Sequence, residues 1–191
     1  MRKYFWWIVL GLLVIWGISS YNGLVGIREN VNKSWANVEN QYQRRADLIP
    51  NLVETVKGAA DFEKSTLEAV TQARASATSM KIDPNDLTPE NIQKYQAVQG
   101  QLGSALGRLL AVAENYPQLK AVQNFQDLQA QLEGTENRIN EARRQYNEAA
   151  QSYNTQRLSF PRVVLARILG FGEKPYFESD KGSEKAPDVK F

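Results

Sequence analysis

The sequence predicts an all-α protein in which a single N-terminal transmembrane helix is followed by an antiparallel four-helix bundle. Three observations predict this class. An uncharged apolar run opens the chain, and apolar residues then recur at spacings of three and four through most of the remainder. No stretch shows the alternation that is typical of a strand. We therefore divide the chain into a transmembrane anchor at 1–23, a helical bundle domain at 24–160, and an amphipathic segment with a polar tail at 161–191.

The length and the aromatic residues of the first segment predict the anchor. No charged residue occurs from Tyr4 through Ile27, a run of about 24 residues that is long enough to cross a hydrocarbon core of roughly 30 Å. Aromatic residues, which favour the two membrane interfaces, lie toward both ends of the run: Tyr4, Trp6 and Trp7, then Trp16 and Tyr21. A cleaved signal peptide is the alternative, because Gly17 and Ser19 have the small side chains of a cleavage site.

Two helices are expected next, near residues 24–45 and 48–80. The first carries a stripe of large side chains at helical spacing: Leu24, Ile27, Val31, Trp35, Val38 and Tyr42. Asp47 suits an N-cap and Pro50 suits the first turn of a new helix, so we expect a turn near Arg45 to Asp47. The alternative is three long helices, in which Pro50 only kinks one helix that runs from about 24 to 80.

Two further helices are expected near 89–114 and 117–157. Thr88-Pro89-Glu90 supplies a capping hydroxyl, a proline at the first helical position and an acid in the first turn. The last helix alternates apolar spacings of three and four through about four heptads, which indicates helix packing. The 89–114 helix contains three glycines, which we interpret as points of close helix approach, with a ligand groove as the alternative: Gly100, Gly103 and Gly107.

The segment after Phe160-Pro161 is short, amphipathic and basic. If four antiparallel helices follow the anchor, residue 160 returns to the lipid surface, where apolar side chains enter the interface and arginines reach phosphates. The candidate membrane-surface residues are Arg162, Val163, Leu165, Arg167, Ile168 and Leu169. Docking of these side chains onto the bundle is the alternative. From about Glu178 onward the polar composition predicts disorder.

Composition excludes several classes of site. The chain has 23 basic and 21 acidic residues, no His and no Cys. The near-cancelling charges give no field that would attract nucleic acid, so no nucleic-acid partner is expected. Without imidazole or thiolate, the usual zinc sets and the Ser-His and Cys-His pairs cannot be built. We therefore expect neither a cofactor nor a metal, and no enzyme activity.

Two groups of residues are candidates for binding a protein partner. Arg44, Arg45 and Asp47 cluster at the predicted turn, where two guanidinium groups can bind a carboxylate or phosphate; helix-end electrostatics and capping are the alternative. Glu63 falls on the apolar stripe of the predicted 48–80 helix between Ala59 and Leu67, so it is a candidate buried carboxylate with a raised pKa. Its alternatives are an ion pair with another helix or a place at the edge of the stripe.

Short motifs spread over roughly residues 20 to 172 carry a resemblance: Tyr21-Asn22-Gly23-Leu24-Val25, Trp35, Val38-Glu39, the run from Tyr42 to Val53, Val56-Lys57, Glu63, Tyr116-Pro117-Leu119, Tyr153-Asn154 and Phe160-Pro161. In these motifs the chain resembles the LemA family of bacterial membrane proteins. The resemblance implies a helical-bundle domain held to the bacterial envelope by its N-terminus, and it implies no catalytic activity or cofactor. The family usually has a His before the carboxylate that aligns with Glu63, and Phe62 stands there in this chain.

The function expected from these observations is that of a non-enzymatic, membrane-anchored interaction or scaffold module in the bacterial envelope. A membrane-surface, lipid-binding module is the alternative, and a carboxylate-dependent hydrolase would require a cleft with at least two acids around Glu63. The expected partners are the lipid bilayer and an unidentified protein. Formation of a homo-oligomer is a further alternative. Arg2 and Lys3 favour a cytoplasmic N-terminus, so we expect a single-pass protein of the cell membrane with most of the chain on the extracytoplasmic side.

Overall fold

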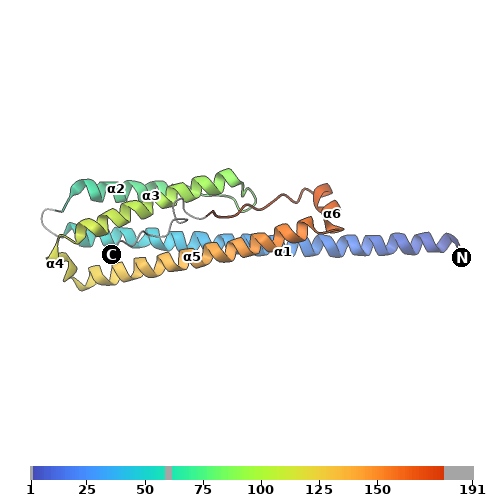
Figure 1. The fold of residues 1–191 in the computed structure, drawn as a ribbon, viewed down its shortest axis with the longest axis horizontal. Coiled ribbons are helices and arrows are strands. Elements are labelled where there is room, and N and C mark those ends of the chain that lie inside the picture. The colour runs from blue at the N-terminus through green and yellow to red at the C-terminus, as the bar shows by residue number, and fades with distance from the viewer. Residues whose placement is uncertain (1, 59–61, 179–191) are drawn as a thin grey trace, which may run out of the picture.

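The computed structural model describes residues 2–58 and 62–178. In those ranges the structure is all-α, as predicted, and contains no strand. The helices, drawn in Figure 1, are α1 (Arg2–Lys57), α2 (Lys64–Ser79), α3 (Pro89–Ala113), α4 (Pro117–Lys120), α5 (Gln123–Leu158) and α6 (Arg162–Ile168). The N-terminal part of α1 projects alone beyond the other helices, which pack around the rest of it (Figure 1). We call the packed part, residues 24–58 and 62–178, the bundle.

Helix α1 continues from the apolar segment into the bundle without a break. It is 56 residues long and contains Pro50 in its interior. The predicted turn at Arg45 to Asp47 is therefore wrong, and so is the separate helix predicted over 48–80. The alternative in which Pro50 stays inside one helix is correct for this part of the chain, but that helix ends at Lys57 and not near residue 80. Gly58, a poor helix former, directly follows its last residue.

A side chain from α2 explains why the helix survives Pro50. A proline has no N–H, so the carbonyl four residues earlier, that of Ala46, has no helical partner. The Nε atom of Arg74 donates to this carbonyl at 2.8 Å. Ala46 is 3% exposed, so water has little access to the same oxygen. Arg74 thus supplies the hydrogen bond that Pro50 removes, from a position 28 residues further along the chain.

This pairing gives a double-mutant test. We expect Arg74→Met to lower the free energy of unfolding by about 1–2 kcal/mol, because it leaves a buried carbonyl unpaired. In a Pro50→Ala background the new N–H of residue 50 serves the same carbonyl, so Arg74→Met should then have a clearly smaller effect. Thermal denaturation of the four chains measures the coupling. Equal losses in both backgrounds would contradict the pairing.

Helices α2 and α3 form a hairpin against α1. The predicted start of the third helix is confirmed, since the Thr88 hydroxyl caps it by accepting from the Asn91 N–H at 3.2 Å. Glu63 is exposed and is the N-cap residue of α2. It therefore lies at the end of a helix and not on a buried stripe. Ala59, which the predicted stripe included, lies outside the described residues.

Helix α5 runs antiparallel to α1 and supplies the regular packing that its heptads predict. The predicted helix over 117–157 is divided, because α4 ends at Lys120 and α5 begins at Gln123. Hydrogen bonds at two levels show the direction: Asn37 pairs with Gln145, and Arg45 pairs with Glu136. Residue numbers rise along α1 as they fall along α5, so the end of α5 returns toward the projecting part of α1 (Figure 1).

Two hydrophobic clusters form the core. The first, which we call the Trp35 cluster, lies nearer the projecting part of α1 and includes Leu24, Val31, Trp35, Tyr42, Tyr95, Tyr146, Tyr153, Phe171 and Phe177. The second, the Leu102 cluster, lies at the far end and includes Ile49, Leu52, Val56, Val70, Leu102, Leu106, Leu109, Phe125 and Leu132. Trp35 is fully buried, and its ring centroid lies 5.3 Å from that of Tyr95 and 5.7 Å from that of Tyr146.

Candidate functional site

A polar layer lies between the two clusters, and Arg45 of α1 is at its centre. The side chain is 5% exposed. Its Nη1 donates to Oε2 of Glu136 in α5 at 3.1 Å, and its Nη2 donates to both the backbone carbonyl and the side-chain oxygen of Gln99 in α3, each at 2.9 Å. Its guanidinium carbon lies 5.1 Å from the ring centroid of Tyr42, within the range of a cation–π contact. Arg45 therefore ties α1 to α3 and α5.

Gln99 extends the polar layer to the remaining long helix. Its Nε2 donates to the carbonyl of Ala77 in α2 at 3.4 Å. The sequence analysis singled out neither partner of Arg45, Gln99 or Glu136. Helical spacing alone could have assigned Gln99 to the buried face of α3, because it lies four residues after Tyr95 and three before Leu102.

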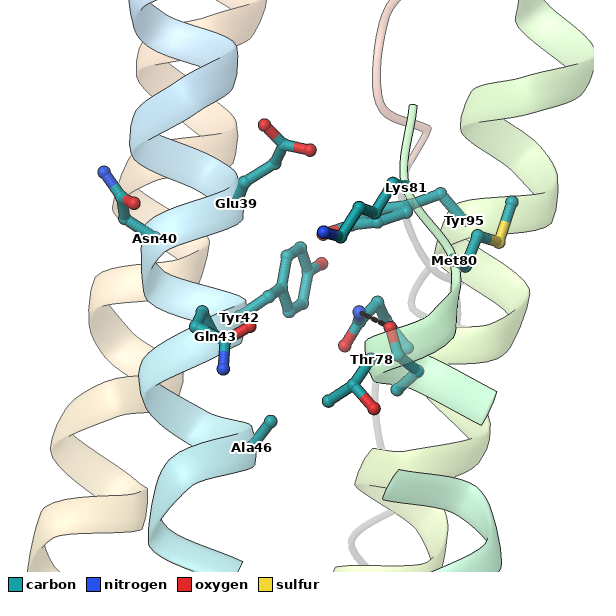
Figure 2. Close-up of a pocket in the computed structure, with 11 residues that line it drawn as sticks. Glu39, Asn40, Tyr42, Gln43, Ala46, Thr78, Met80, Lys81 and Tyr95 are labelled. Carbon is teal, nitrogen blue, oxygen red and sulfur yellow. Dashed lines mark hydrogen bonds between the residues drawn. The ribbon is translucent and has the colours of Figure 1, made fainter. Parts of the chain in front are cut away.

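A cavity of about 310 Å³ opens beside this layer, between α1, the end of α2 and α3. Figure 2 shows Glu39 and Tyr42 of α1 facing Tyr95 of α3 and Lys81, which follows α2. Burial raises the pKa of the Glu39 carboxyl above its ordinary value, and the charge of Lys81 opposes that rise. Burial also raises the pKa of the Tyr95 phenol, and the Glu39 charge adds to the rise. The walls thus offer a carboxyl group, an ammonium group and two phenol hydroxyls, all of which can hydrogen-bond a small polar molecule.

A second, more apolar cavity of about 340 Å³ lies on the other side of Arg45, between α3 and α5. Gly103 and Gly107 line it, together with Leu132 and Glu136. A Cβ atom placed on Gly100 or on Gly107 would meet nothing within 4 Å. The interpretation of these glycines as points of close helix approach is therefore wrong at those two positions. Two of the three glycines line a groove, the alternative that the sequence left open.

The structure separates the residues that were predicted to bind a protein partner. Arg44 and Asp47 are exposed on α1, and the Asp47 carboxylate accepts from Gln43 at 2.7 Å. Arg45 points into the bundle instead. Glu63 lies at the start of α2, whereas Arg45 reaches the end of α2 through Gln99, so the two are separated by most of that helix. The Glu63 carboxylate accepts from the Thr66 hydroxyl at 3.0 Å.

Helix α6 lies beside α1 at the base of the projecting part. A Cβ atom on Gly23 would lie 3.8 Å from the Arg162 guanidinium, which itself donates to the Gln156 side chain. The predicted membrane-surface residues divide into two sets. Arg162, Val163 and Leu165 are partly buried, and the neighbouring Ala166 is 2% exposed. Arg167, Ile168 and Leu169 are exposed, Ile168 at 74%.

Residues 170–178, which we call the strap, run back along the bundle in an extended form. Phe171, Lys174 and Phe177 in this segment are buried. Two asparagines of α5 each make a pair of hydrogen bonds to the backbone of one strap residue. Asn154 donates to the Lys174 carbonyl at 2.7 Å and accepts from its N–H at 3.0 Å. Asn147 does the same with Phe177, at 3.0 and 2.9 Å.

Further side chains of α5 and α3 also hydrogen-bond the strap. The hydroxyl of Tyr146 donates to the Pro175 carbonyl at 3.0 Å, and that of Tyr153 donates to the Gly172 carbonyl at 2.8 Å. The last described residue, Glu178, accepts from both Gln96 and Arg143 through its carbonyl. The disorder predicted after Glu178 concerns residues outside the described part. The sequence analysis missed the strap, because the segment has few apolar residues. Only Phe171 and Phe177 could have indicated that it packs on the bundle.

The side-chain types available as metal ligands predict whether the protein binds a metal ion. In the described ranges, no three His, Cys, Asp or Glu side chains gather as they would around a metal ion. Elemental analysis of the purified full-length chain is expected to find no transition metal at stoichiometric amounts, because the donor set lacks imidazole and thiolate. One tightly held metal ion per chain would contradict this expectation.

Comparison with known proteins gives one family match and several relatives. The sequence pattern of the LemA family matches residues 34–191. Magnetosome protein MamQ 1 of Paramagnetospirillum magneticum is 30% identical over 175 residues, which cover 83% of this chain and 64% of the relative. Magnetosome protein MamQ of Magnetospirillum gryphiswaldense is 29% identical, with 82% and 64% covered. Protein LemA of Metamycoplasma hominis is 22% identical, with 93% and 77% covered. The chain thus spans 64% of the length of these magnetosome relatives.

Proposed function

Since this chain belongs to the LemA family, we propose that it is a non-enzymatic, membrane-anchored module that sits on the bilayer surface and presents its helical bundle to a partner protein in the bacterial envelope. The names of its relatives refer to a family and to the magnetosome, and to no reaction, which supports a non-enzymatic role. A hydrolase that depends on Glu63 has no support, because that carboxylate is exposed and lines none of the cavities described above.

The distribution of exposed apolar side chains is the observation that carries this proposal. In the described ranges, large exposed apolar residues gather on α1 from Tyr4 to Tyr21 and at the adjacent end of the bundle: Leu158, Phe160, Val164, Ile168 and Leu169. Only Val122 and Tyr176 of the large exposed set lie elsewhere. Monomeric soluble proteins rarely expose contiguous patches of this kind, so a membrane is the surface that would cover both.

Helix α1 itself has the properties of a membrane span. It is long and apolar enough to cross a bilayer, and only 11% of its most apolar window is buried by the rest of the chain. A core helix of a soluble protein would be mostly buried. A signal sequence would pass the same test of length, but here the helix runs unbroken into the bundle core at Leu24 and Val31. With Arg2 and Lys3 before the span, we place the bundle on the extracytoplasmic side.

The continuous helix supports the role of an interaction module. From residue 24 to Lys57 it extends for about 50 Å at 1.5 Å per residue. The far end of the bundle, which is made of the start of α2, the end of α3 and α4, would therefore stand well clear of the lipid, where a partner protein can reach it. The arginines of α6 at the near end, Arg162 and Arg167, lie at the level where they can meet lipid phosphates.

Depth-dependent quenching tests the contact with the bilayer. The chain has no Cys, so a single Ile168→Cys variant of the full-length protein can carry one environment-sensitive probe. Val122→Cys, exposed at the opposite end of the bundle, is the matched control. In liposomes we expect lipid-phase quenchers to reduce the signal at residue 168 and not at residue 122. Absence of quenching at both positions would overturn the seating of α6 in the interface.

Affinity capture tests the partner. The full-length protein in detergent is compared with residues 1–23 fused to an unrelated helical domain, so that capture through the span alone is subtracted. A protein retained only by the full-length chain is expected. If no protein is retained while residue 168 is quenched by lipid-phase quenchers, the lipid-binding role is the function and the partner role is wrong.

A further inference from the structure

The polar cavity between α1, the end of α2 and α3 has an acidic side chain on one wall and a basic side chain on the facing wall. We propose that this cavity binds a small zwitterion, a molecule that carries one ammonium and one carboxylate group, between Glu39 and Lys81. Free amino acids and dipeptides belong to this class. The inference goes beyond the proposed function, which assigns no ligand to the cavity.

Glu39 is a carboxylate that is partly buried without an ion pair. Its side chain extends from α1 into the space between α1 and α3 (Figure 2). Burial raises its pKa, and the charge of Lys81 only partly opposes that rise. The ion pairs found within residues 2–58 and 62–178 do not include Glu39. Loss of water around a carboxylate is unfavourable unless a cation compensates for it, and the ammonium group of a ligand can be that cation.

Lys81 supplies the opposite charge from the facing wall. It follows α2, and its ammonium group extends toward α1 (Figure 2). This side chain also forms no ion pair with any residue that the structure describes. The phenol groups of Tyr42 and Tyr95 line the same cavity, and burial raises the pKa of Tyr95, so its hydroxyl keeps its proton. An ammonium group and two phenol groups on the walls of one cavity are suited to bind a carboxylate.

Contacts within the bundle hold the walls of the cavity in place. Tyr42 and Tyr95 are 5% and 4% exposed, and their rings meet edge to face with centroids 5.4 Å apart. Gln99, which also lines the cavity, is fixed by its hydrogen bonds to Arg45 and to the carbonyl of Ala77. A ligand therefore does not have to order these side chains, which lowers the entropic cost of binding.

The two charges favour a zwitterion over a simple ion. A lone cation beside Glu39 would be repelled by Lys81, and a lone anion beside Lys81 would be repelled by Glu39. A zwitterion can pair with both side chains and leaves the net charge of the cavity unchanged. The cavity volume of about 310 Å³ lies at the lower end of the range for small-molecule sites, about 300–1,000 Å³, which suits a molecule of this size.

The position of the cavity along α1 indicates that its ligand comes from water. From Leu24 to Glu39 the helix rises by about 22 Å, so a membrane that covers the residues before Leu24 does not reach the cavity. The lining residues Asn40 and Gln43 are exposed, as expected where a cavity opens to water. A soluble zwitterion therefore fits this place better than the headgroup of a lipid.

Saturation-transfer NMR tests the ligand class. The full-length protein in nanodiscs is mixed with two panels, the common amino acids and the dipeptides that begin with alanine, each compound at about 1 mM. Every compound that binds is then compared with its N-acetyl form, which lacks the ammonium group, and with its C-terminal amide, which lacks the carboxylate. Glu39→Gln and Lys81→Met remove the two charges of the cavity. Glu54→Gln and Lys33→Met remove the same charges from exposed positions outside it and are the matched controls.

At least one compound of the panels is expected to bind, and both of its derivatives should bind about tenfold more weakly. Glu39→Gln should weaken the parent compound to the level of its N-acetyl form, and Lys81→Met should weaken it to the level of its amide. The two control variants should bind like the unchanged protein.

Three results would overturn the proposal: no compound of either panel binds, the derivatives bind as well as their parents, or the cavity variants bind like the controls. None of these results affects the lipid quenching at residue 168 or the capture of a partner protein. Failure of the ligand site is therefore distinguishable from failure of the proposed function.

Discussion

Arg45→Ala is expected to lower the free energy of unfolding by about 3 kcal/mol, because it removes one buried cation that serves three acceptor oxygens on α3 and α5. Both Gln99 oxygens would lose a donor inside the bundle. Glu136 contributes less, because its side chain is 52% exposed and solvent can screen its charge. Denaturation of the full-length protein in detergent, followed by circular dichroism, measures the loss.

Two variants separate the buried role of Arg45 from the general effect of removing a charge. Arg44→Ala removes the same charge from the neighbouring exposed position and should change the free energy of unfolding by under about 0.5 kcal/mol. Glu136→Gln keeps an acceptor for Arg45 and should cost at most about 1 kcal/mol. Similar losses for Arg44→Ala and Arg45→Ala would show that the polar layer does not stabilise the bundle.

Phe177→Ala should also lower the free energy of unfolding by about 3 kcal/mol, although the residue lies 19 positions beyond the last long helix. The phenyl ring is 5% exposed and packs on Trp35 and Tyr146, so its removal leaves a cavity in the Trp35 cluster. Amide hydrogen exchange should become faster across the strap, because its strongest apolar contact is lost.

The neighbouring Tyr176 provides the control for Phe177. Its side chain is 42% exposed, and its hydroxyl accepts one hydrogen bond from Asn154 at 3.1 Å. Tyr176→Ala should therefore cost about 1 kcal/mol. If Phe177→Ala is no more destabilising than Tyr176→Ala, the strap is not part of the core.

Local patterns in the sequence were sufficient to predict the helical class, the start of α3 and most of α5, but not the bounds of α1 and α2. Apolar spacing predicted α5, and the Thr88 cap and the proline after it predicted the start of α3. The turn expected at Arg45 to Asp47 was wrong because the rule for proline considers only the helix that contains it. At Pro50 the missing hydrogen bond is supplied by Arg74 from another helix, and no local pattern contains that information.

The candidate sites were harder to predict, since they depend on pairs of residues that are distant along the chain. The sequence singled out Arg45 for an external partner, and the structure gives it internal partners 54 and 91 residues away. The strap has too few apolar residues to be recognised as part of a core. Its fit depends on two asparagines that, in the sequence, resemble any others on a solvated helix face.

The unbroken course of α1 also has a mechanical consequence. With Arg74 completing the hydrogen bonding at Pro50, helix α1 continues without a hinge from its apolar N-terminal part to the far tip of the bundle. If that part spans the bilayer as proposed, the helix is a stiff lever whose pivot lies in the lipid. A change of about 10° in the tilt of the span, well within the range that bilayer thickness imposes, would swing a tip about 50 Å away by roughly 9 Å. Bilayer thickness would in this way set where the tip stands.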